Sequence, residues 1–252
     1  MANFLFLHAH PDDEAIFTGG IIRKLADDGH NVYVTFATGG ELGNNEHESK
    51  QTRELRFEES EKAREILGLK EISFLGYHDS GLDPKGFPEN AFASCDVEVA
   101  SNKLADYISK NNVDVLICDD EYGIYGHPDH VQANKVGIRA SEKTDLSELY
   151  FTTVDREYLH FVETHLVEEA SLSTSTLDLA KSTIGMSSVE ITHTIDINSV
   201  LNVKRKAMAA HASQINDTSS ALTLNDEQFK AVYGYEWFFS ESQMSSFKKY
   251  CI

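Results

Sequence analysis

The stretch NFLFLHAHPDDEAIFTGG, residues 3–20, is an apolar run followed at once by histidines and acidic residues. Residues 3–9 predict a buried β-strand, and the residues behind them predict a helix over about 15–28, which Gly29 ends. Burial of unpaired charge is costly, so these ionisable groups lie either in a solvated turn or against a cation. The stretch therefore predicts a strand–helix unit with a candidate cation site at the junction.

The same alternation of strand and helix continues along the chain. Further strands are expected over 31–38, 71–76, 113–118 and 148–154, and further helices over about 50–68, 96–111 and 130–141. Strands that alternate with helices of this length form βαβ units. We therefore predict an α/β fold, with a Rossmann-like, mostly parallel sheet and helices on both faces.

The C-terminal part has a less regular pattern. It contains an expected strand over 189–197, an amphipathic helix over 199–215 and a packed aromatic segment over 233–239, whereas 155–190 has no clear periodicity. The length of 252 residues is ordinary for one α/β domain. We expect a single domain over 1–252, with a Rossmann-like core over about 1–154 and a C-terminal extension that completes it.

Charge and composition limit the partners and the compartment. The net charge is −19 and the isoelectric point is about 4.9, which argues against nucleic acid or anionic lipid as a partner. No run approaches the ~20 apolar residues of a membrane span, and the start lacks the basic region of a signal peptide. The three scattered cysteines form no CxxC pair, and Cys118 lies in an apolar run typical of a core. We expect a cytoplasmic protein without a membrane segment, and a homo-oligomer is compatible with these features.

Ionisable residues follow four of the expected strands. His10, Asp12 and Asp13 come after the first strand and Asp79 after the third. Glu41 follows the second strand, and an acidic and histidine-rich loop over 119–130 follows the fourth. In open α/β sheets ligands bind at the carboxyl ends of the strands. We therefore expect all four groups to meet at one edge of the sheet.

Two similar short motifs offer ligands for a metal. The first is HPDD, with His10 and Asp13 three residues apart, and the second is HPDH, with His127 and His130 three residues apart. A catalytic zinc typically has three protein ligands and one open position. The best set is His10, Asp13 and His130. The same set also suits a 2-His-1-carboxylate iron site.

The residues left free beside these ligands suit hydrolysis. Asp12 can act as general base on a water at the open position, and His127 can stabilise an oxyanion or protonate a leaving group. Asp129 can hydrogen-bond a histidine of the site and fix its tautomer, and Tyr125 can add a hydroxyl donor. An oxygenase does not need this acid–base pair. The pattern therefore favours hydrolysis of an amide or ester.

Structural interpretations compete with these functional ones. Acidic residues at a helix start suit the helix dipole, which explains Asp12 and Asp13 but not His10. The run over 119–121 is expected to be a hydrated acidic loop rather than a second metal site. Local sequence places Arg56 on a solvated helix face and Asp79 in an Asx turn. His193 and His211 are expected in capping or core positions.

Several stretches resemble one enzyme family. AHPDDE at 9–14 and GHPDH at 126–130 are similar to paired motifs of the LmbE-like, or PIG-L-type, de-N-acetylases. Further similar stretches are TGGELG at 38–43, the helix pattern at 56–68, FLGYHDSGL at 74–82, KRKAMAAHASQ at 204–214 and YGYEWFF at 233–239. The resemblance spans nearly the whole chain and is weakest between about 155 and 190.

The resemblance implies a zinc-dependent hydrolase on a Rossmann-like fold, with an N-acetyl group on a glucosamine unit as the usual substrate. It implies that His10, Asp13 and His130 bind zinc and that Asp12 is the general base. It also implies that His127 is the electrophile or general acid. Arg56 and Asp79 match family residues that contact the sugar, and Tyr125 matches a mobile tyrosine thought to help the oxyanion.

We therefore expect a zinc-dependent hydrolase that removes an N-acetyl group from a soluble amino-sugar conjugate, with Zn²⁺ or another divalent metal such as Fe²⁺ as cofactor. Three alternatives remain: an amidase acting on a thiol-conjugated glucosaminide, a non-haem iron enzyme with the same ligands, and a sugar-binding or structural protein that has lost catalysis. Metal content and a requirement for oxygen separate the iron enzyme from the others. The loops over 43–51 and 77–90 are expected to select the group on the anomeric carbon.

Overall fold

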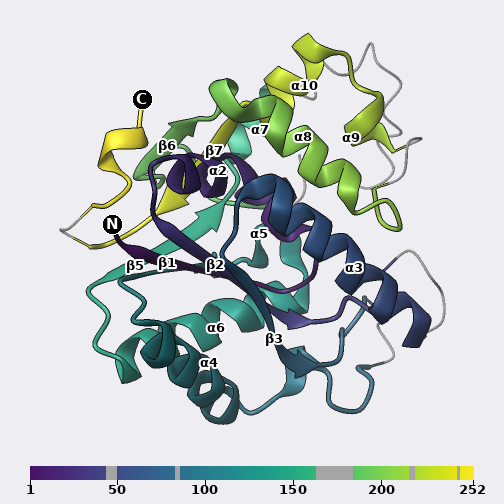
Figure 1. Ribbon diagram of the computed structural model, residues 1–252, viewed down its shortest axis with the longest axis vertical. Coiled ribbons are helices and arrows are strands. Elements are labelled where there is room, and N and C mark those ends of the chain that lie inside the picture. Colours follow the sequence, from purple (N-terminus) through teal and green to yellow (C-terminus); the bar gives the residue numbers. More distant parts are fainter. Residues whose placement is uncertain (44–49, 83–85, 163–183, 216–218, 243–244) are drawn as a thin grey trace.

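The computed structural model describes the chain except residues 44–49, 83–85, 163–183, 216–218 and 243–244. Its centre is a seven-stranded sheet in the order β3-β2-β1-β4-β5-β7-β6, with helices on both faces (Figure 1). The parallel strands are β1 (Asn3–His8), β2 (Asn31–Thr38), β3 (Glu71–Tyr77), β4 (Val115–Asp119) and β5 (Glu148–Thr153). The α/β class and the Rossmann-like, mostly parallel sheet are therefore confirmed.

Helices cover the sheet in two layers (Figure 1). One layer contains α2 (Gly19–Asp27), α3 (Lys50–Leu67) and α8 (Leu201–Ala210). The other contains α4 (Val97–Asn111) and α6 (Pro128–Lys143). Shorter helices are α1 (Asp13–Phe17), α5 (Gly123–Gly126), α7 (Arg156–Val162), α9 (Ser220–Thr223) and α10 (Asp226–Tyr233). Short 3₁₀ turns lie at Phe92–Ser94, Asn198–Val200 and Lys248–Tyr250.

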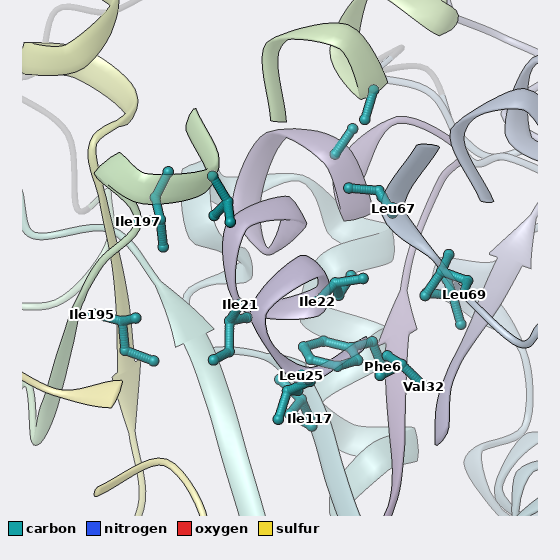
Figure 2. Close-up of a cluster of buried hydrophobic side chains, with 14 of the residues drawn as sticks. Phe6, Ile21, Ile22, Leu25, Val32, Leu67, Leu69, Ile117, Ile195 and Ile197 are labelled. Carbon is teal, nitrogen blue, oxygen red and sulfur yellow. The ribbon is translucent and has the colours of Figure 1, made fainter. Parts of the chain in front are cut away.

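Strand β1 is buried on both faces because its side chains alternate between two cores. Phe4 and Phe6 pack with α2 and α8, in the core that Figure 2 shows. Leu5 and Leu7 pack with α4 and α6 on the opposite side. A strand of a parallel sheet covered on both faces needs such a continuous apolar run. The run therefore places β1 at the centre and its carboxyl end under the polar residues that follow.

The helix expected over 15–28 is two helices, α1 and α2, which meet at Thr18. Thr18 has a non-helical φ of −133°, and its hydroxyl lies 2.9 Å from His8 Nε2. The N–H groups of Gly20 and Ile21 donate to the carboxylate of Glu236 on β7. A distant carboxylate thus supplies the partners that a second helix start needs, which local sequence does not reveal.

The C-terminal part also differs in detail from the prediction. The aromatic segment over 233–239 contains β7 (Tyr235–Phe239), which pairs antiparallel with β5 and with β6 (His193–Asp196). The strand expected over 189–197 is shorter, as is the helix expected over 199–215, which begins at Leu201 and ends at Ala210. In the unclear stretch 155–190 the structure contains α7, and 163–183 lie outside the described residues.

The strand order reverses at β1, which lies between β2 and β4. Ligands of open α/β sheets bind outside the carboxyl ends of the strands at such a reversal. The motifs of the sequence analysis follow β1 and β4 and so lie there. Cys118 is buried, as expected, and the three cysteines are free. None of the helices in the described ranges has the length and apolar character needed to cross a membrane.

Candidate active site

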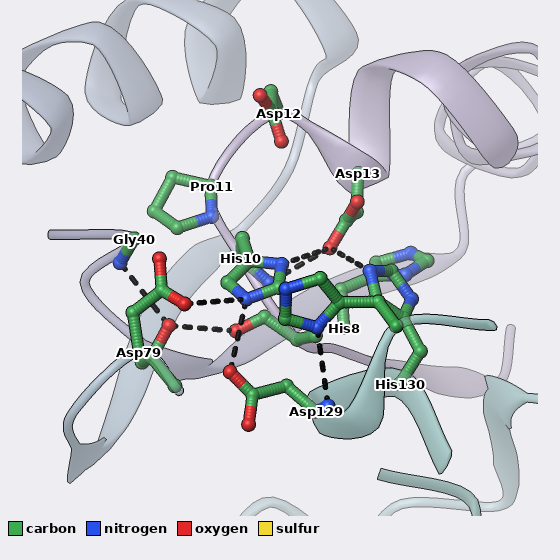
Figure 3. Close-up of polar contacts among 12 residues, drawn as sticks. His8, His10, Pro11, Asp12, Asp13, Gly40, Asp79, Asp129 and His130 are labelled. Carbon is green, nitrogen blue, oxygen red and sulfur yellow. Dashed lines mark hydrogen bonds and ion pairs between the residues drawn. The ribbon is translucent and has the colours of Figure 1, made fainter. Parts of the chain in front are cut away.

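His10, Asp13 and His130 come together at the carboxyl ends of β1 and β4 (Figure 3). His10 lies two residues beyond β1, Asp13 is the first residue of α1, and His130 lies in the first turn of α6. One oxygen of Asp13, Oδ2, lies 3.6 Å from His10 Nδ1 and 3.4 Å from His130 Nε2. All three side chains are buried. The segment after β1 and the first turns of α1 and α6 therefore bring three donor side chains together.

The spacing and chemistry of these donors fit a divalent metal. Zinc bonds to histidine nitrogen and carboxylate oxygen are about 2.0–2.2 Å long, so tetrahedral ligand atoms lie roughly 3.3–3.5 Å apart. The contacts of Asp13 Oδ2 with the two histidines, at 3.4 and 3.6 Å, are close to that spacing. Two imidazoles and one carboxylate are also a donor set that leaves a fourth position open.

Each of the two histidines has a carboxylate on its other ring nitrogen. Asp119 Oδ2, at the end of β4, lies 2.8 Å from His130 Nδ1, and Asp129 Oδ2 lies 3.1 Å from His10 Nε2. Such partners fix the tautomer and ring orientation of metal-ligating histidines. The expectation of a hydrated acidic loop is wrong for Asp119 and Asp120, which are fully buried. The one feature of the sequence that could have indicated the contact of Asp119 with His130 is the position of Asp119 at the end of an expected strand.

Asp129 also links the two motifs to the loop after β3. Its carboxylate accepts the N–H of Ser80 at 2.9 Å and the Ser80 hydroxyl. Its own N–H donates to Nδ1 of His127, the N-cap of α6, at 3.1 Å. Because Nδ1 of His127 is an acceptor, a neutral ring carries its proton on Nε2. Burial, with the His10 and His130 rings nearby, lowers the pKa of His127 to about 4, which favours this neutral form.

Asp12 lies beside the three donors but outside the contacts that join them (Figure 3). Its Oδ2 is 3.2 Å from Arg56 Nη2, and its side chain lines a pocket. Burial raises the pKa of Asp12 to about 6, against the lowering effect of Arg56. The pKa of Asp13 is lowered well below its ordinary range, because His130 and His10 outweigh its burial. Neighbouring carboxyls with opposed pKa shifts suit different roles, one as proton carrier and one as permanent anion.

Arg56 and Asp79 lie at the site, although local sequence favoured simpler roles for both. Arg56, expected locally on a solvated helix face, is 2% exposed and donates to the backbone carbonyls of Gly40 and Pro11. Asp79 forms the expected turn by accepting the N–H of Gly81 at 2.8 Å, and its Oδ1 lies 3.5 Å from His10 Nε2. Both side chains line the same pocket as Asp12.

Tyr125 reaches the site from α5, the short helix after β4. Its hydroxyl lies 3.2 Å from His130 Nε2, and its side chain remains 40% exposed. The preceding residue, Ile124, has φ of +57°, which is unusual for a β-branched residue. The N–H of Ile124 donates to Asp120, and its carbonyl accepts from Gly185. Two backbone contacts thus hold the residue before Tyr125 in this conformation.

A pocket of about 440 Å³ opens over these groups. Its lining includes His10, Asp12, Arg56, Asp79, Tyr125 and His127. Leu42 and Leu82 add apolar walls beside these polar groups. The loops expected to select the group on the anomeric carbon contain 44–49 and 83–85, which lie outside the described residues. A pocket of this size with convergent polar groups suits a small polar ligand.

Comparison with known proteins identifies the family of this chain. The family model of PIG-L, GlcNAc-PI de-N-acetylase, matches residues 5–141. A 1D-myo-inositol 2-acetamido-2-deoxy-alpha-D-glucopyranoside deacetylase from Nocardiopsis dassonvillei is 31% identical, over 93% of this chain and 92% of its own.

Solved structures have the same fold. The N,N'-diacetylchitobiose deacetylase from Pyrococcus horikoshii aligns with a TM-score of 0.62 at 23% identity, over 98% of this chain and 88% of its own. A deacetylase of teicoplanin biosynthesis aligns with a TM-score of 0.65 at 15% identity, over 97% of this chain and 100% of its own. With a family model that covers more than half of the sequence and a relative that matches nearly all of it, this chain belongs to the PIG-L, or GlcNAc-PI de-N-acetylase, family.

Proposed function

We propose that this protein is a metal-dependent hydrolase that removes the acetyl group from the nitrogen of a glucosamine unit in a small sugar conjugate. One observation carries the proposal: a donor set for a metal, of which His10 lines the pocket, lies beside a separate carboxylate and imidazole, Asp12 and His127, that line the same pocket. The Nocardiopsis relative is named for deacetylation of such a conjugate, a 2-acetamido-2-deoxy-glucopyranoside of inositol. Hydrolysis adds water across the amide bond and yields acetate and a free amine.

We assign His10, Asp13 and His130 as ligands of Zn²⁺, which prefers this nitrogen and oxygen donor set. A bound zinc ion supplies a Lewis acid that polarises a carbonyl and lowers the pKa of water. Asp119 and Asp129 hold the two imidazoles in the tautomers that leave His130 Nε2 and His10 Nδ1 facing Asp13. Fe²⁺ fits the same ligands, and metal analysis of the purified protein distinguishes the two.

Asp12 and His127 are assigned the proton transfers. Asp12 takes the proton of the attacking water, because its carboxylate faces the pocket and is not engaged with the donor set. His127 donates through Nε2–H to the developing oxyanion, since its Nδ1 is occupied by the N–H of Asp129. The proton held by Asp12 then passes to the leaving amine. Tyr125 adds a second donor, its hydroxyl, which lies on the same side as His130.

We assign Asp79 and Arg56 to substrate binding, Asp79 through direct contact with the substrate and Arg56 mainly through the groups that it holds in place. The carboxylate of Asp79 lines the pocket and can accept hydrogen bonds from sugar hydroxyls. The Arg56 guanidinium donates to the carbonyls of Gly40 and Pro11 and pairs with the Asp12 carboxylate. Its main effect is therefore to hold Asp12 and the backbone around the pocket in position. We also propose a cytoplasmic location, in keeping with the free cysteines, and a substrate that is not embedded in a membrane.

Acetate release tests the proposal directly. The zinc-loaded protein is incubated with N-acetylglucosamine conjugates that carry inositol, a second sugar, an organic acid or a small alkyl group, and acetate and free amine are measured. We expect both products in equal amounts from at least one conjugate. Cleavage only of an amide in a thiol-conjugated glucosaminide would favour the amidase alternative. Absence of acetate from every conjugate would contradict the proposal.

The carboxylate behind His130 provides a separate prediction. Replacement of Asp119 by Asn removes the charge 2.8 Å from His130 Nδ1 and is expected to weaken Zn²⁺ binding about 10–100-fold. Competition with a zinc-binding dye measures the affinity. Asp106→Asn, on the exposed face of α4, is the matched control and should bind as the wild type does. Equal zinc affinity of the Asp119 and Asp106 variants would contradict this role.

A further inference from the structure

Glu14 and His211 form a buried pair directly behind Asp12. Glu14 Oε1 lies 2.6 Å from His211 Nε2, and the two side chains are 1% and 0% exposed. Glu14 is the second residue of α1, whereas His211 is the C-cap of α8, 197 positions along the chain. None of the roles assigned above uses this pair, although it lies next to the assigned general base.

The other oxygen of Glu14 holds the backbone of Asp12. The N–H of Asp12 donates to Glu14 Oε2 at 2.9 Å. Asp12 is the N-cap of α1, with φ of +112°, outside the regions that non-glycine residues favour. Such a conformation persists only where surrounding contacts determine it. Within the described contacts Glu14 is the group that accepts this N–H.

The hydrogen bond between the Asp12 N–H and Glu14 leaves the Asp12 carboxylate free of a capping role. An N-cap aspartate usually accepts an N–H of its own helix with its carboxylate. Asp12 makes no such cap bond; its carboxylate faces Arg56 and the pocket instead. Glu14 accepts the N-cap N–H from the second helical position, a contact that a capping box makes from the third, so this N–H has a partner while the Asp12 carboxylate stays available.

His211 is itself held in place by the segment that follows α8. The N–H and hydroxyl of Ser213 donate to Glu59 on α3 at 2.8 and 2.7 Å. His211 therefore belongs to a segment that is hydrogen-bonded to α3, the helix that contains Arg56. The ring orients one oxygen of Glu14, which leaves the other directed at Asp12.

We propose that the Glu14–His211 pair is a positioning device that fixes the backbone of Asp12 so that its carboxylate points at the reacting water. This inference rests on the proposed function, because it acts through Asp12 as general base. Glu14 and His211 are positioning residues, since neither lines the pocket. The sequence predicts a capping or core position for His211, but its partner Glu14 is revealed only by the fold.

The test is a double-mutant cycle with Glu14→Ala and Asp12→Asn, measured as kcat and KM for acetate release at equal zinc content. Glu14→Ala is expected to lower kcat about 10–100-fold with KM and zinc content unchanged. In the Asp12→Asn background the same change should cost nothing further, because the effect passes through Asp12. Glu14→Gln retains a carbonyl oxygen for the Asp12 N–H and should keep most of the kcat.

Lys204→Gln is the matched control, because it alters another buried ion pair of α8 that does not touch Asp12. It should lower the Tm and leave kcat per folded molecule unchanged. If Glu14→Ala does not fold, His211→Ala and His211→Gln replace it, with the loss of kcat expected for Ala and its recovery for Gln, whose amide can donate to Glu14.

Wild-type kcat in Glu14→Ala, or an equal further loss in the Asp12→Asn background, would overturn the inference. A wild-type protein that releases no acetate would overturn the proposed function instead, so the two failures are distinguishable.

Discussion

Replacement of Asp12 by Asn is expected to lower kcat for acetate release by about 10²–10⁴-fold, the range that a general base contributes. Asn keeps the shape of the side chain but cannot accept a proton from water. Asp12 lies outside the contacts among His10, Asp13 and His130, so zinc content should not change. KM should also stay near the wild-type value, because the loss concerns the chemical step.

Steady-state kinetics and metal analysis of the same preparation check this prediction. Asp27→Asn, at the exposed end of α2, is the matched control and should retain wild-type kcat. A fully active Asp12→Asn protein would exclude Asp12 as the base. A loss of activity that follows a loss of zinc would instead make Asp12 part of the metal site.

Replacement of Glu236 by Ala is expected to lower the free energy of unfolding by about 3–5 kcal/mol, the typical cost of breaking a buried ion pair. Glu236 Oε1 lies 2.6 Å from Lys204 Nζ, and both side chains are 1% exposed. Its two oxygens also accept the N–H groups of Gly20 and Ile21 at 2.7 and 2.8 Å. The variant leaves a buried ammonium and the start of α2 without partners.

Urea denaturation followed by circular dichroism measures this effect. Glu142→Ala removes an exposed ion pair with Arg139 and should barely change the midpoint, because solvent screens such pairs. Similar midpoints for the two variants would show that the α2–β7–α8 contact contributes little to stability.

The parallel half of the sheet was predictable because its signals are local. Each of the first strands is a short apolar run, and each is followed by a helix of ordinary length, which together determine a βαβ arrangement. The break at Thr18 was not predictable, because it depends on Glu236, more than 200 positions away. The place of β7 in the sheet was not predictable either, because its antiparallel pairing with β5 joins segments far apart in the sequence. The single domain over 1–252 stays a prediction.

The candidate site was predictable to a similar extent. The paired HPDD and HPDH motifs indicated which side chains meet, because the carboxyl ends of parallel strands share one edge of the sheet. The motifs did not indicate which other side chains are buried against these residues. Asp119 looked like part of a hydrated loop but lies at 2.8 Å from His130 in the interior. His211 is brought to Glu14 only by the packing of α8 against α1.

We propose that this pocket hydrolyses an N-acetyl group with the help of a metal held by His10, Asp13 and His130. The most direct test is acetate release from the best conjugate before chelation, after removal of the metal, and after addition of one equivalent of Zn²⁺. We expect release to stop on chelation and to return with zinc in the wild type, while His130→Ala should neither retain zinc nor recover activity. Undiminished release from the fully metal-free wild-type protein would show that the reaction does not depend on this metal.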